Sequence, residues 1–428
     1  MIVNKRENCR ISDGKLNLLW DLGNLYLSDF YKTKEENKNI APLKVGIGEK
    51  SKLIQLMDSV DRDLLYRQYW YLSGTNETMT KQLEDIVEVV PNWVRLNEND
   101  IVLDIGCNDG TLLGHYNKFT NLKRIGIDPA TNFAKPSIEK MDHFLNEYFD
   151  KDIFLNFTNG LKAKAITSIA MFYDLEDPGK FASDIKACLD DDGIWILQLS
   201  YTPLMLIQNA FDNIIHEHLE YYTLESINYI MKNNDLKIID VDFNNTNAGS
   251  IRVTVTHASN DIKNVALYNK DIGEIRFKST LDYENKNFSD PERAFLDLKN
   301  RTETLKNKTL ELLTNFKKKG KKVIGYGAST KGNTLLQYYG ISSDLIDSIA
   351  ERQKQKEGTI TPGSWINVIS EEKMRQMKPD YLLKLFNLIP FDFYKYGSTQ
   401  PSMSRTDYES MCFPIPDKEE RQLITNYV

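Results

Sequence analysis

The chain has 428 residues and a net charge of -7, with 41% of its residues hydrophobic and 27% charged. This composition is that of a globular protein with room for two or three domains, and its acidic balance argues against a nucleic-acid-binding protein. No apolar run reaches the ~20 residues that span a membrane, and the polar segment Met1–Arg10 does not resemble a secretion signal, so a soluble cytoplasmic protein is expected.

Residues 1–78 combine short apolar runs with glycine and lysine, and they predict a small amino-terminal domain. The domain ends in an aromatic cluster, Tyr66–Tyr71. Small polar residues follow Tyr69-Trp70-Tyr71 at once, so this segment is compatible with a packed core or with a loop that lines a pocket. The cysteines of the chain have no paired spacing and indicate neither a disulfide framework nor a metal knuckle; they are Cys9, Cys107, Cys188 and Cys412.

Residues 79–257 alternate helical and strand-like patterns, beginning with a helix over Thr80–Val94. Two later apolar runs, Leu236–Phe243 and Ser250–His257, flank an asparagine-rich turn and predict an antiparallel pair at one edge of a sheet. Parallel strands followed by a terminal hairpin predict an α/β domain of the class I methyltransferase type. The earlier strands are predicted at 101–105, 124–128, 165–172 and 193–200.

The first of these strands runs into a tight turn, and a helix is predicted from Thr111 to Asn117. Such a turn brings the backbone close to a nucleoside cofactor at the carboxyl end of a strand. An acid follows the second strand, where it would accept hydrogen bonds from a ribose diol. The turn carries acids and no basic residue, so it suits S-adenosylmethionine (SAM) better than a pyrophosphate. The expected cofactor-binding residues are Asp104, Gly106, Asn108, Asp109 and Gly110 at the methionine end and Asp128 at the ribose.

His216-Glu217-His218 lies in a loop after the fifth strand, and these two histidines are among only five in the chain. Two imidazoles and a carboxylate this close can supply a general base with a pKa near neutral. A zinc site would need a cysteine or a third histidine at ligand spacing, which the sequence does not have. Surface histidines, or Glu217 as an ion-pair partner only, are the other interpretations. The enrichment favours a catalytic loop.

Residues 258–288 are polar and without periodicity, and we interpret them as a connection. The capping box Ser289–Glu292 then opens a long helix that continues to Phe316. Val323–Ser329 predicts a strand that enters a glycine turn, followed by a helix from Asn333. Residues 289–428 therefore predict a second, Rossmann-like domain.

The second glycine turn, Gly325–Thr334, combines small residues, hydroxyl groups and one lysine at a helix amino terminus. This pattern is typical of an anion-binding nest, although a packed turn would look similar. Its spacing differs from that of a P-loop, and no acid for Mg²⁺ is evident. The sequence favours a substrate diphosphate held by Ser329 and Lys331.

Taken together, these segments resemble the sugar C-methyltransferases that act on nucleotide-linked keto-deoxysugars, and the resemblance extends over nearly the whole chain. The Asn108-Asp109 pair is a distinctive part of it. The matching segments are 103–113 with 126–130 for the cofactor, 211–222 for the active-site loop, Ala248–Arg252, and 326–329, 331–334 and 361–364 in the carboxyl-terminal domain.

The resemblance implies three domains with a sugar-nucleotide substrate between the lobes, in a monomer or homodimer that uses SAM. It implies that His218 is the base, that Glu217 beside it orients or polarises, and that Tyr71 or Tyr69 touches the sugar. The other residues implied to bind substrate are His216, Arg252, Tyr326, Asn333 and Thr334.

The sequence departs from the family in three places. Family members usually carry a four-cysteine zinc site in the amino-terminal domain, whereas only Cys9 remains and 44–53 contains no cysteine. We expect no structural zinc, so packing must supply the folding energy that metal binding would give. Phe172-Tyr173-Asp174 replaces a histidine at the end of the fourth strand, and Ile215 replaces the tyrosine before His216.

The expected reaction is proton abstraction beside a ketone followed by methyl transfer to carbon, which needs a base and a donor to the enolate oxygen. Tyr71, Tyr173 and Tyr222 are the candidate donors. The alternatives are an O- or N-methyltransferase on the same kind of sugar nucleotide and a non-catalytic sugar-nucleotide-binding protein. A nicotinamide oxidoreductase at Gly325–Gly327 is disfavoured, because no ribose-binding acid follows on a clear second strand.

Overall fold

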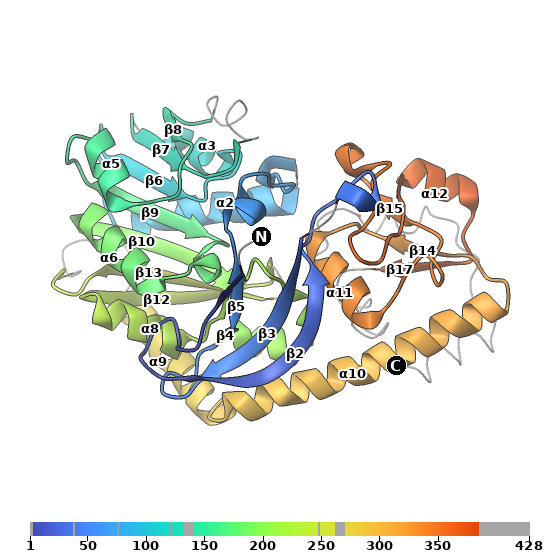
Figure 1. Cartoon of the computed structure of the whole chain (residues 1–428). Coiled ribbons are helices and arrows are strands. Elements are labelled where there is room, and N and C mark those ends of the chain that lie inside the picture. The colour runs from blue at the N-terminus through green and yellow to red at the C-terminus, as the bar shows by residue number, and fades with distance from the viewer. Residues whose placement is uncertain are drawn as a thin grey trace.

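A computed structural model of the chain describes residues 3–36, 39–75, 77–119, 121–131, 140–246, 249–261 and 270–384. Figure 1 shows a large sheet with helices on both faces, an amino-terminal strand layer beside it, and a smaller α/β unit on the far side of that layer. The predicted α/β class with a second unit at the carboxyl end is confirmed. The predictions for Ala248, for Cys412 and for 385–428 lie outside the described residues.

The large sheet has seven strands in the order β12-β13-β10-β9-β6-β7-β8. The five strands from β10 to β8 are parallel, and β13 joins β10 antiparallel to form the predicted edge hairpin with β12. The bounds are β6 Ile101–Ile105, β7 Lys123–Ile127, β8 His143–Leu145, β9 Ala163–Ile169, β10 Leu189–Ser200, β12 Leu236–Asn244 and β13 Ser250–His257.

Strand β6 lies at the point where the chain order reverses. The chain runs from β6 to β7 and β8 in one direction and then returns to β9 and β10 on the other side of β6. In open α/β sheets, ligands bind at the carboxyl ends of the strands at such a switch point. All five residues of β6 are buried, as in parallel sheets covered on both faces.

Helices cover both faces of this sheet. One face packs on α5, α6 and α8 through residues such as Phe154, Ile185 and Ile227, and the other on α2 and α3 through Ile86 and Leu112. The helix predicted to follow β6 is α3, which continues as a 3-10 helix, η4. The bounds are α2 Glu77–Val89, η3 Val90–Asn92, α3 Thr111–Gly114, η4 His115–Lys118, α5 Lys151–Phe157, η6 Phe172–Asp174, α6 Pro178–Cys188, α7 Thr202–Ile207, η7 Phe211–Asn213 and α8 Leu224–Asn233.

The segment 258–288, interpreted as a connection, contains helix α9 (Lys270–Asn287), so the expectation of an aperiodic segment there was wrong. Helix α9 packs on β12 and α8, where Phe277 and Leu281 are partly buried against the core and polar contacts lie beside them. At Gly273 a Cβ would lie 2.3 Å from the Ile239 carbonyl oxygen. Glu284 accepts the Leu224 N–H at the start of α8, at 2.6 Å. Such contacts leave no helical period in the sequence.

The amino-terminal strands form a four-stranded antiparallel sheet in the order β11-β4-β3-β2. Its edge strand, β11, comes from the predicted catalytic loop, with Glu220 opposite Gln55 and Tyr221 opposite Ile54. The loop is therefore attached to the amino-terminal unit as well as to the large sheet. The bounds are β1 Val3–Lys5, β2 Leu16–Tyr26, η1 Lys34–Glu36, β3 Ile40–Gly48, β4 Ile54–Leu56, β5 Asp58–Val60, α1 Asp63–Tyr66, η2 Ser73–Thr75 and β11 Glu220–Tyr221.

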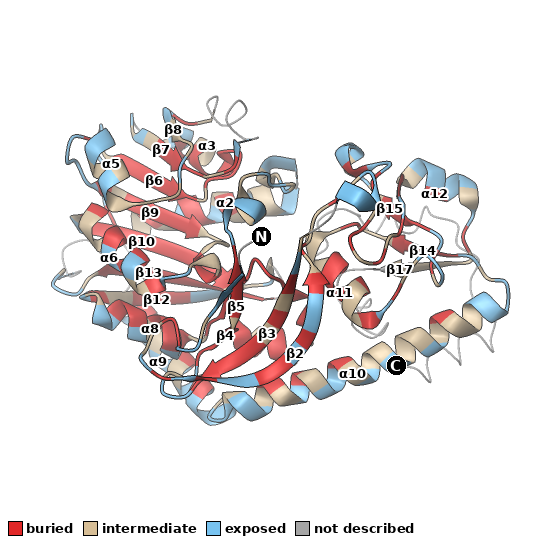
Figure 2. Cartoon of the chain, in the orientation of Figure 1, coloured by how far each residue is buried: buried red, intermediate tan, exposed pale blue. Residues whose placement is uncertain are grey.

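The carboxyl-terminal sheet has four parallel strands in the order β16-β15-β14-β17. Its long leading helix, α10, begins one residue later than the predicted capping box implied: Asp290, not Ser289, is the cap and accepts the Arg293 N–H at 3.0 Å. In Figure 2 the strands of this sheet are largely buried and α10 is half-buried along much of its length. The bounds are α10 Pro291–Lys318, β14 Val323–Tyr326, α11 Thr330–Tyr339, β15 Ile349–Glu351, η10 Lys354–Lys356, β16 Val368–Ser370, α12 Glu371–Met377 and β17 Tyr381–Lys384.

All three units share one aromatic core. Trp20 of β2 lies 5.8 Å from Phe211 of η7 and 6.2 Å from Phe295 of α10, between ring centroids. Phe211 stacks in turn on Tyr339 of α11 at 5.8 Å. Aromatic pairs at these distances add to the stability gained from burial. The loop that contains Phe211, which was predicted to be catalytic, thus packs between the amino- and carboxyl-terminal units.

The surroundings of Cys9 show what stands at the position of a family zinc ligand. Its Sγ lies 3.1 Å from Ser51 Oγ and accepts a hydrogen bond from Gln55 Nε2 at 3.0 Å. Within the described ranges, no group of three or more His, Cys, Asp or Glu side chains is arranged to hold a metal ion. No helix in the same ranges is long and apolar enough to cross a membrane.

Candidate active site

The turn after β6 adopts left-handed backbone at three positions, with φ of 70° at Gly106, 52° at Asn108 and 74° at Gly110. Glycine adopts this conformation freely and asparagine tolerates it better than most residues. A Cβ at Gly106 would also lie 3.2 Å from the Met171 side chain. The backbone can therefore pass close to a ligand at the carboxyl end of β6.

Two buried carboxyl groups lie at this turn. Asp128 accepts the backbone N–H groups of Asn108 and Ala130, both at 2.9 Å. Asp104 accepts the Thr167 hydroxyl at 2.6 Å. Burial raises the pKa of both carboxyls, that of Asp104 to about 7. Each carboxylate oxygen has two lone pairs, so Asp128 retains acceptor capacity for a ribose diol.

Asn108 and Asp109 form hydrogen bonds to the segment 71–74, at the end of the aromatic cluster, and hold it next to the turn. Asn108 Nδ2 donates to the Tyr71 carbonyl at 2.9 Å, and Asp109 accepts the Gly74 N–H at 3.1 Å. Asp109 also pairs with Lys140 at 3.0 Å, which brings to the turn a basic group that the turn sequence itself does not contain. The carboxylate of Asp109 is therefore engaged with protein groups, and its position does not support the cofactor contact expected for it.

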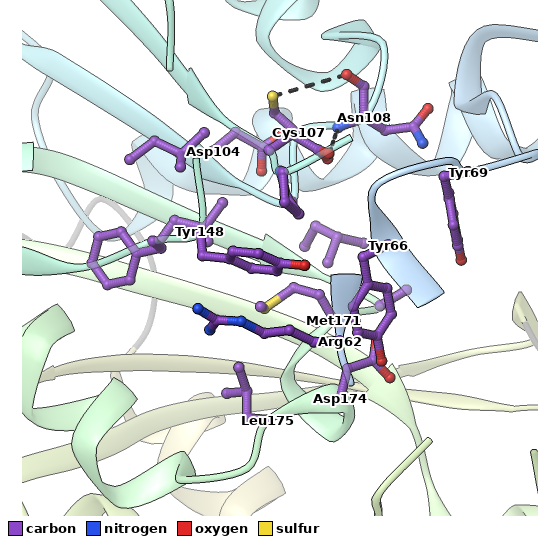
Figure 3. A pocket seen from close by; sticks show the side chains of 18 of the residues that line it. Arg62, Tyr66, Tyr69, Asp104, Cys107, Asn108, Tyr148, Met171, Asp174 and Leu175 are labelled. Carbon is purple, nitrogen blue, oxygen red and sulfur yellow. Dashed lines mark hydrogen bonds between the residues drawn. The ribbon is translucent and has the colours of Figure 1, made fainter. Parts of the chain in front are cut away.

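A cavity of about 270 Å³ joins this turn to the aromatic segment. Four tyrosines line it: the predicted Tyr69 and Tyr71, and Tyr66 and Tyr148, whose roles the sequence did not indicate. Figure 3 shows Tyr66 and Asp174 on one side of the cavity and Asp104 on the other. Its charged lining consists of Asp104, Asp128, Glu147, Asp174, Glu176 and one cation, Arg62. A lining rich in carboxyl groups suits a cationic ligand such as a sulfonium.

His218 is held in one tautomer. Its Nδ1 lies 2.9 Å from the Asn213 carbonyl oxygen, so Nδ1 carries the hydrogen and Nε2 has the lone pair. The ring packs on Tyr173 with 4.3 Å between centroids. Burial and the nearby Lys331 ammonium lower the pKa of His218 to about 3. The imidazole is therefore neutral at physiological pH and can accept a proton.

The pKa of Glu217, the residue before His218 in the chain, is shifted in the opposite direction. Burial raises its pKa to about 7, and Oε2 is buried without a hydrogen-bond partner among the described residues. The loop contacts the cavity wall through Leu219, which lines it, and through Tyr66, whose hydroxyl donates to the Glu217 carbonyl at 2.8 Å. Neither the His218 imidazole nor the Glu217 carboxyl lines the cavity itself; the loop that contains them reaches the cavity wall through Leu219.

Three other predicted residues of this region lie elsewhere. His216 Nε2 is 3.2 Å from the Ala41 carbonyl in β3, Tyr173 lies under His218, and Tyr222 is buried against Phe172 with 5.3 Å between rings. None of the three lines the cavity. Their positions do not support substrate binding by His216 or enolate contacts by Tyr173 and Tyr222.

Arg252 is also remote from the cavity. It lies in β13, where its Nε donates to Gln198 Oε1 at 3.1 Å and its NH2 group to Asp85 Oδ2 at 2.6 Å. It lines a separate cavity of about 60 Å³ together with Asp240 and Arg276. This position gives it a structural role between β13 and α2, so the substrate contact expected for Arg252 is not supported.

The side chains of the predicted anion nest bind protein groups. Lys331 reaches across to the catalytic loop, where its Nζ donates to Asn213 Oδ1 at 2.5 Å. The diphosphate contacts expected for these residues are therefore not supported. The others pair as follows: Ser329 caps α11 at Gly332 N (2.9 Å), Tyr326 donates to Glu371 (2.6 Å), Asn333 donates to the Asp29 carbonyl (3.0 Å), and Thr334 Oγ1 lies 3.5 Å from Ser28 Oγ.

The second Rossmann-like turn has an acid that the sequence analysis did not find. β15 runs parallel to β14 and ends in Glu351, whose carboxylate accepts the Ala328 N–H at 2.7 Å. The statement that no acid follows on a clear second strand was therefore wrong. Because Glu351 occupies a backbone N–H of the turn, it stands where a bound phosphate would be expected.

A mostly parallel sheet with a terminal hairpin, and a carboxyl-lined crevice at its switch point, together define a class I SAM-dependent methyltransferase. The methyltransferase domain family matches residues 75–241, and the C-methyltransferase C-terminal domain family matches residues 245–395. The chain is 26% identical over 350 residues to the C-methyltransferase NovU of Streptomyces niveus, and the aligned region covers 81% of each protein. The chain belongs to the SAM-dependent C-methyltransferases.

Two solved structures are similar to part of the chain. An S-adenosylmethionine-dependent methyltransferase from Clostridium acetobutylicum has a TM-score of 0.34 and 17% identity, over 42% of this chain and 92% of that one. The magnesium protoporphyrin IX methyltransferase of Synechocystis, with bound SAM, has a TM-score of 0.30 and 12% identity, over 43% and 79%.

Replacing Asp128 with alanine is expected to weaken SAM binding about 10- to 100-fold, the range for hydrogen bonds to a charged group. The variant loses the ribose acceptor and also the anchor of the Asn108 N–H. Isothermal titration with SAM measures the change. Asp142→Ala is the matched control, because Asp142 pairs with Arg124 at the opposite end of the sheet and does not line the cavity. Equal affinity in both variants would contradict this role for Asp128.

Proposed function

We propose that the chain transfers a methyl group from SAM to a carbon beside the ketone of a nucleotide-linked keto-deoxysugar. The observation that carries the proposal is the cavity that runs from the cofactor turn to Tyr66, Tyr69 and Tyr71, with the loop of His218 reaching its wall through Leu219. Transfer to oxygen or nitrogen needs no carbon-acid base, whereas this site sets a neutral imidazole beside a buried carboxyl. The relationship to C-methyltransferases agrees with transfer to carbon.

SAM, when bound, supplies an electrophilic methyl group on a cationic sulfur. In the proposed reaction, Asp128 accepts the ribose hydroxyls and the backbone of Gly106 approaches the methionine end. His218 removes the proton beside the ketone through Nε2, while its Nδ1–H stays on Asn213. The negative charge that develops on the substrate favours protonated His218, which offsets the low pKa of the free protein.

Labelled product identification tests the proposal. The enzyme is given SAM with a ¹³C-methyl group and a panel of nucleotide-linked keto-sugars, and the product is located by mass spectrometry and NMR. We expect the label on a ring carbon next to the carbonyl carbon. In deuterated water without SAM, we also expect deuterium to enter that carbon, because the base removes its proton reversibly.

A methylated oxygen or nitrogen, or transfer with no deuterium exchange at carbon, would contradict the carbon mechanism and favour the O- or N-methyltransferase alternative. Calorimetric binding of SAM to the same preparation is the control. It separates an inactive preparation from an unsuitable substrate panel.

A further inference from the structure

Asp174 has no structural role that explains its position. It ends η6, directly after β9, and its backbone N–H donates to the Met171 carbonyl at 3.1 Å. Among the described residues, its Oδ1 is buried without a hydrogen-bond partner. The cap of the following helix is a different acid, Asp177, which accepts the Lys180 N–H at 2.8 Å. A buried carboxyl without a partner costs stability, so its presence calls for another explanation.

The location of Asp174 in the cofactor cavity indicates a role in ligand binding. Its side chain lines the cofactor cavity, and β9, which it follows, neighbours β6 in the sheet. Figure 3 shows it beside Tyr66 and across the cavity from Asp104. A methyl acceptor bound between the cofactor turn and the tyrosines would therefore contact Asp174.

The charges around Asp174 decide its protonation. Glu217 and Glu220 face it from the 211–222 loop and β11, and Lys331 faces it from α11. The other titratable neighbours are Tyr66, Tyr69, Tyr173, Tyr221 and Tyr222. Burial, and then repulsion by the two glutamates, raises the pKa of Asp174 well above its usual value, against the opposing effect of Lys331. Such surroundings favour the protonated form of the carboxyl, which can act as a hydrogen-bond donor.

We propose that Asp174 is a catalytic residue that donates a hydrogen bond to the ketone oxygen of the methyl acceptor. This inference rests on the proposed function. When the base takes the proton, the C–H electron pair forms the C=C bond and the carbonyl π pair moves onto oxygen, where Asp174 stabilises it. The enolate carbon then forms the new C–C bond, the S–CH₃ bond breaks with its electrons remaining on sulfur, and the carbonyl re-forms. Asp174 keeps its proton throughout.

Two substitutions of similar size distinguish a hydrogen-bond donor at position 174 from an ionised acceptor or a purely structural residue. Asp174→Asn keeps a hydrogen-bond donor in the same place, whereas Asp174→Leu removes every polar atom. We expect kcat of the Leu variant to fall about 100- to 1000-fold, the loss found for a missing donor to an enzyme-bound oxyanion. We expect the Asn variant to fall about 10-fold or less, since its amide replaces the donor. SAM affinity should remain unchanged in both.

Thermal unfolding distinguishes the catalytic role from a structural one. The Leu variant should unfold at the wild-type temperature or above it, because it removes an unpaired buried carboxyl. Equal kcat and KM in the wild type and the Leu variant would overturn the proposal. Equal loss in both variants would also overturn it, because Asp174 would then act as an ionised acceptor. Failure of the proposed function gives a different result, since the wild type itself would then not methylate carbon.

Discussion

Replacing His218 with asparagine is expected to lower the rate of methyl transfer about 100- to 10,000-fold, the range for loss of a general base. Asparagine can still donate to the Asn213 carbonyl from a position near that of Nδ1, so the loop should keep its shape. It has no group in place of Nε2. Single-turnover rates with bound SAM measure the effect, and calorimetry should show unchanged SAM affinity. Full activity would remove His218 from the mechanism.

His216→Asn is the matched control for this substitution. His216 belongs to the same loop, and burial lowers its pKa to about 4, but its Nε2 lies 3.2 Å from the Ala41 carbonyl, so the nitrogen proposed to act in His218 is engaged in His216. We expect kcat to remain within about threefold of wild type in this variant, and thermal stability to fall because a buried hydrogen bond is lost. Equal loss of kcat in the two histidine variants would mean that loop packing, and not proton transfer, explains the effect.

The pH profile assigns the two acid–base groups of the loop separately. The raised pKa of Glu217 lies at about 7, so its carboxylate form predominates above pH 7 and is lost as pH falls through that value. If the carboxylate assists His218, kcat/KM will decline below pH 7, and Glu217→Gln will abolish this decline. His218, with a pKa lowered to about 3, stays neutral throughout this range and contributes no decline near pH 7.

The first turn and its strands could be predicted because their determinants are local. Ile101–Ile105 is a continuous apolar run that ends at a glycine turn, and the observed β6 has those bounds. β13 likewise matches the predicted strand. The position of Asp128 also followed from the sequence, because neighbouring parallel strands present their carboxyl ends at one edge. Helix α9 could not be predicted, because a few tertiary contacts specify it and no periodicity accompanies them.

Partners of individual side chains proved harder to predict than their chemistry. Arginine and lysine often bind phosphates, yet in the structure Arg252 donates a hydrogen bond to Asp85 and Lys331 donates one to Asn213. These choices depend on contacts between residues more than 100 positions apart, which one sequence does not specify. Asp174 was noted as a departure from the family, but its missing hydrogen-bond partner became visible only when the surrounding residues were in place.

The attachment of the catalytic loop to the amino-terminal sheet was also unforeseen, and it rests on a buried ion pair. Arg10 Nε lies 3.4 Å from Glu220 Oε1, and both side chains are completely buried. Arg10 also donates to the Leu56 carbonyl at 2.6 Å. Glu220 is two residues from His218, so the pair connects the amino-terminal unit to the proposed base.

Arg10→Met is therefore expected to destabilise the protein by about 3–5 kcal/mol, because it leaves Glu220 buried without its cation. Denaturant unfolding followed by tryptophan fluorescence measures the loss. Arg6→Met is the matched control: Arg6 pairs with Glu176 at 3.2 Å, but both side chains are partly exposed, and such pairs contribute only about 0–1 kcal/mol. Equal losses of stability in the two variants would show that the buried pair contributes no more to stability than the exposed pair.

The double variant Arg10→Met with Glu220→Met tests the reason for this loss. Replacing both members of a buried ion pair with apolar residues is often neutral or stabilising, because neither charge then needs to be desolvated. We expect the double variant to recover most of the stability that Arg10→Met loses. If it also recovers methyl transfer, then Arg10 acts on catalysis by holding β11 and the His218 loop in place. If stability returns without activity, then the charge at position 220 itself is required beside Asp174, whose pKa Glu220 helps to raise.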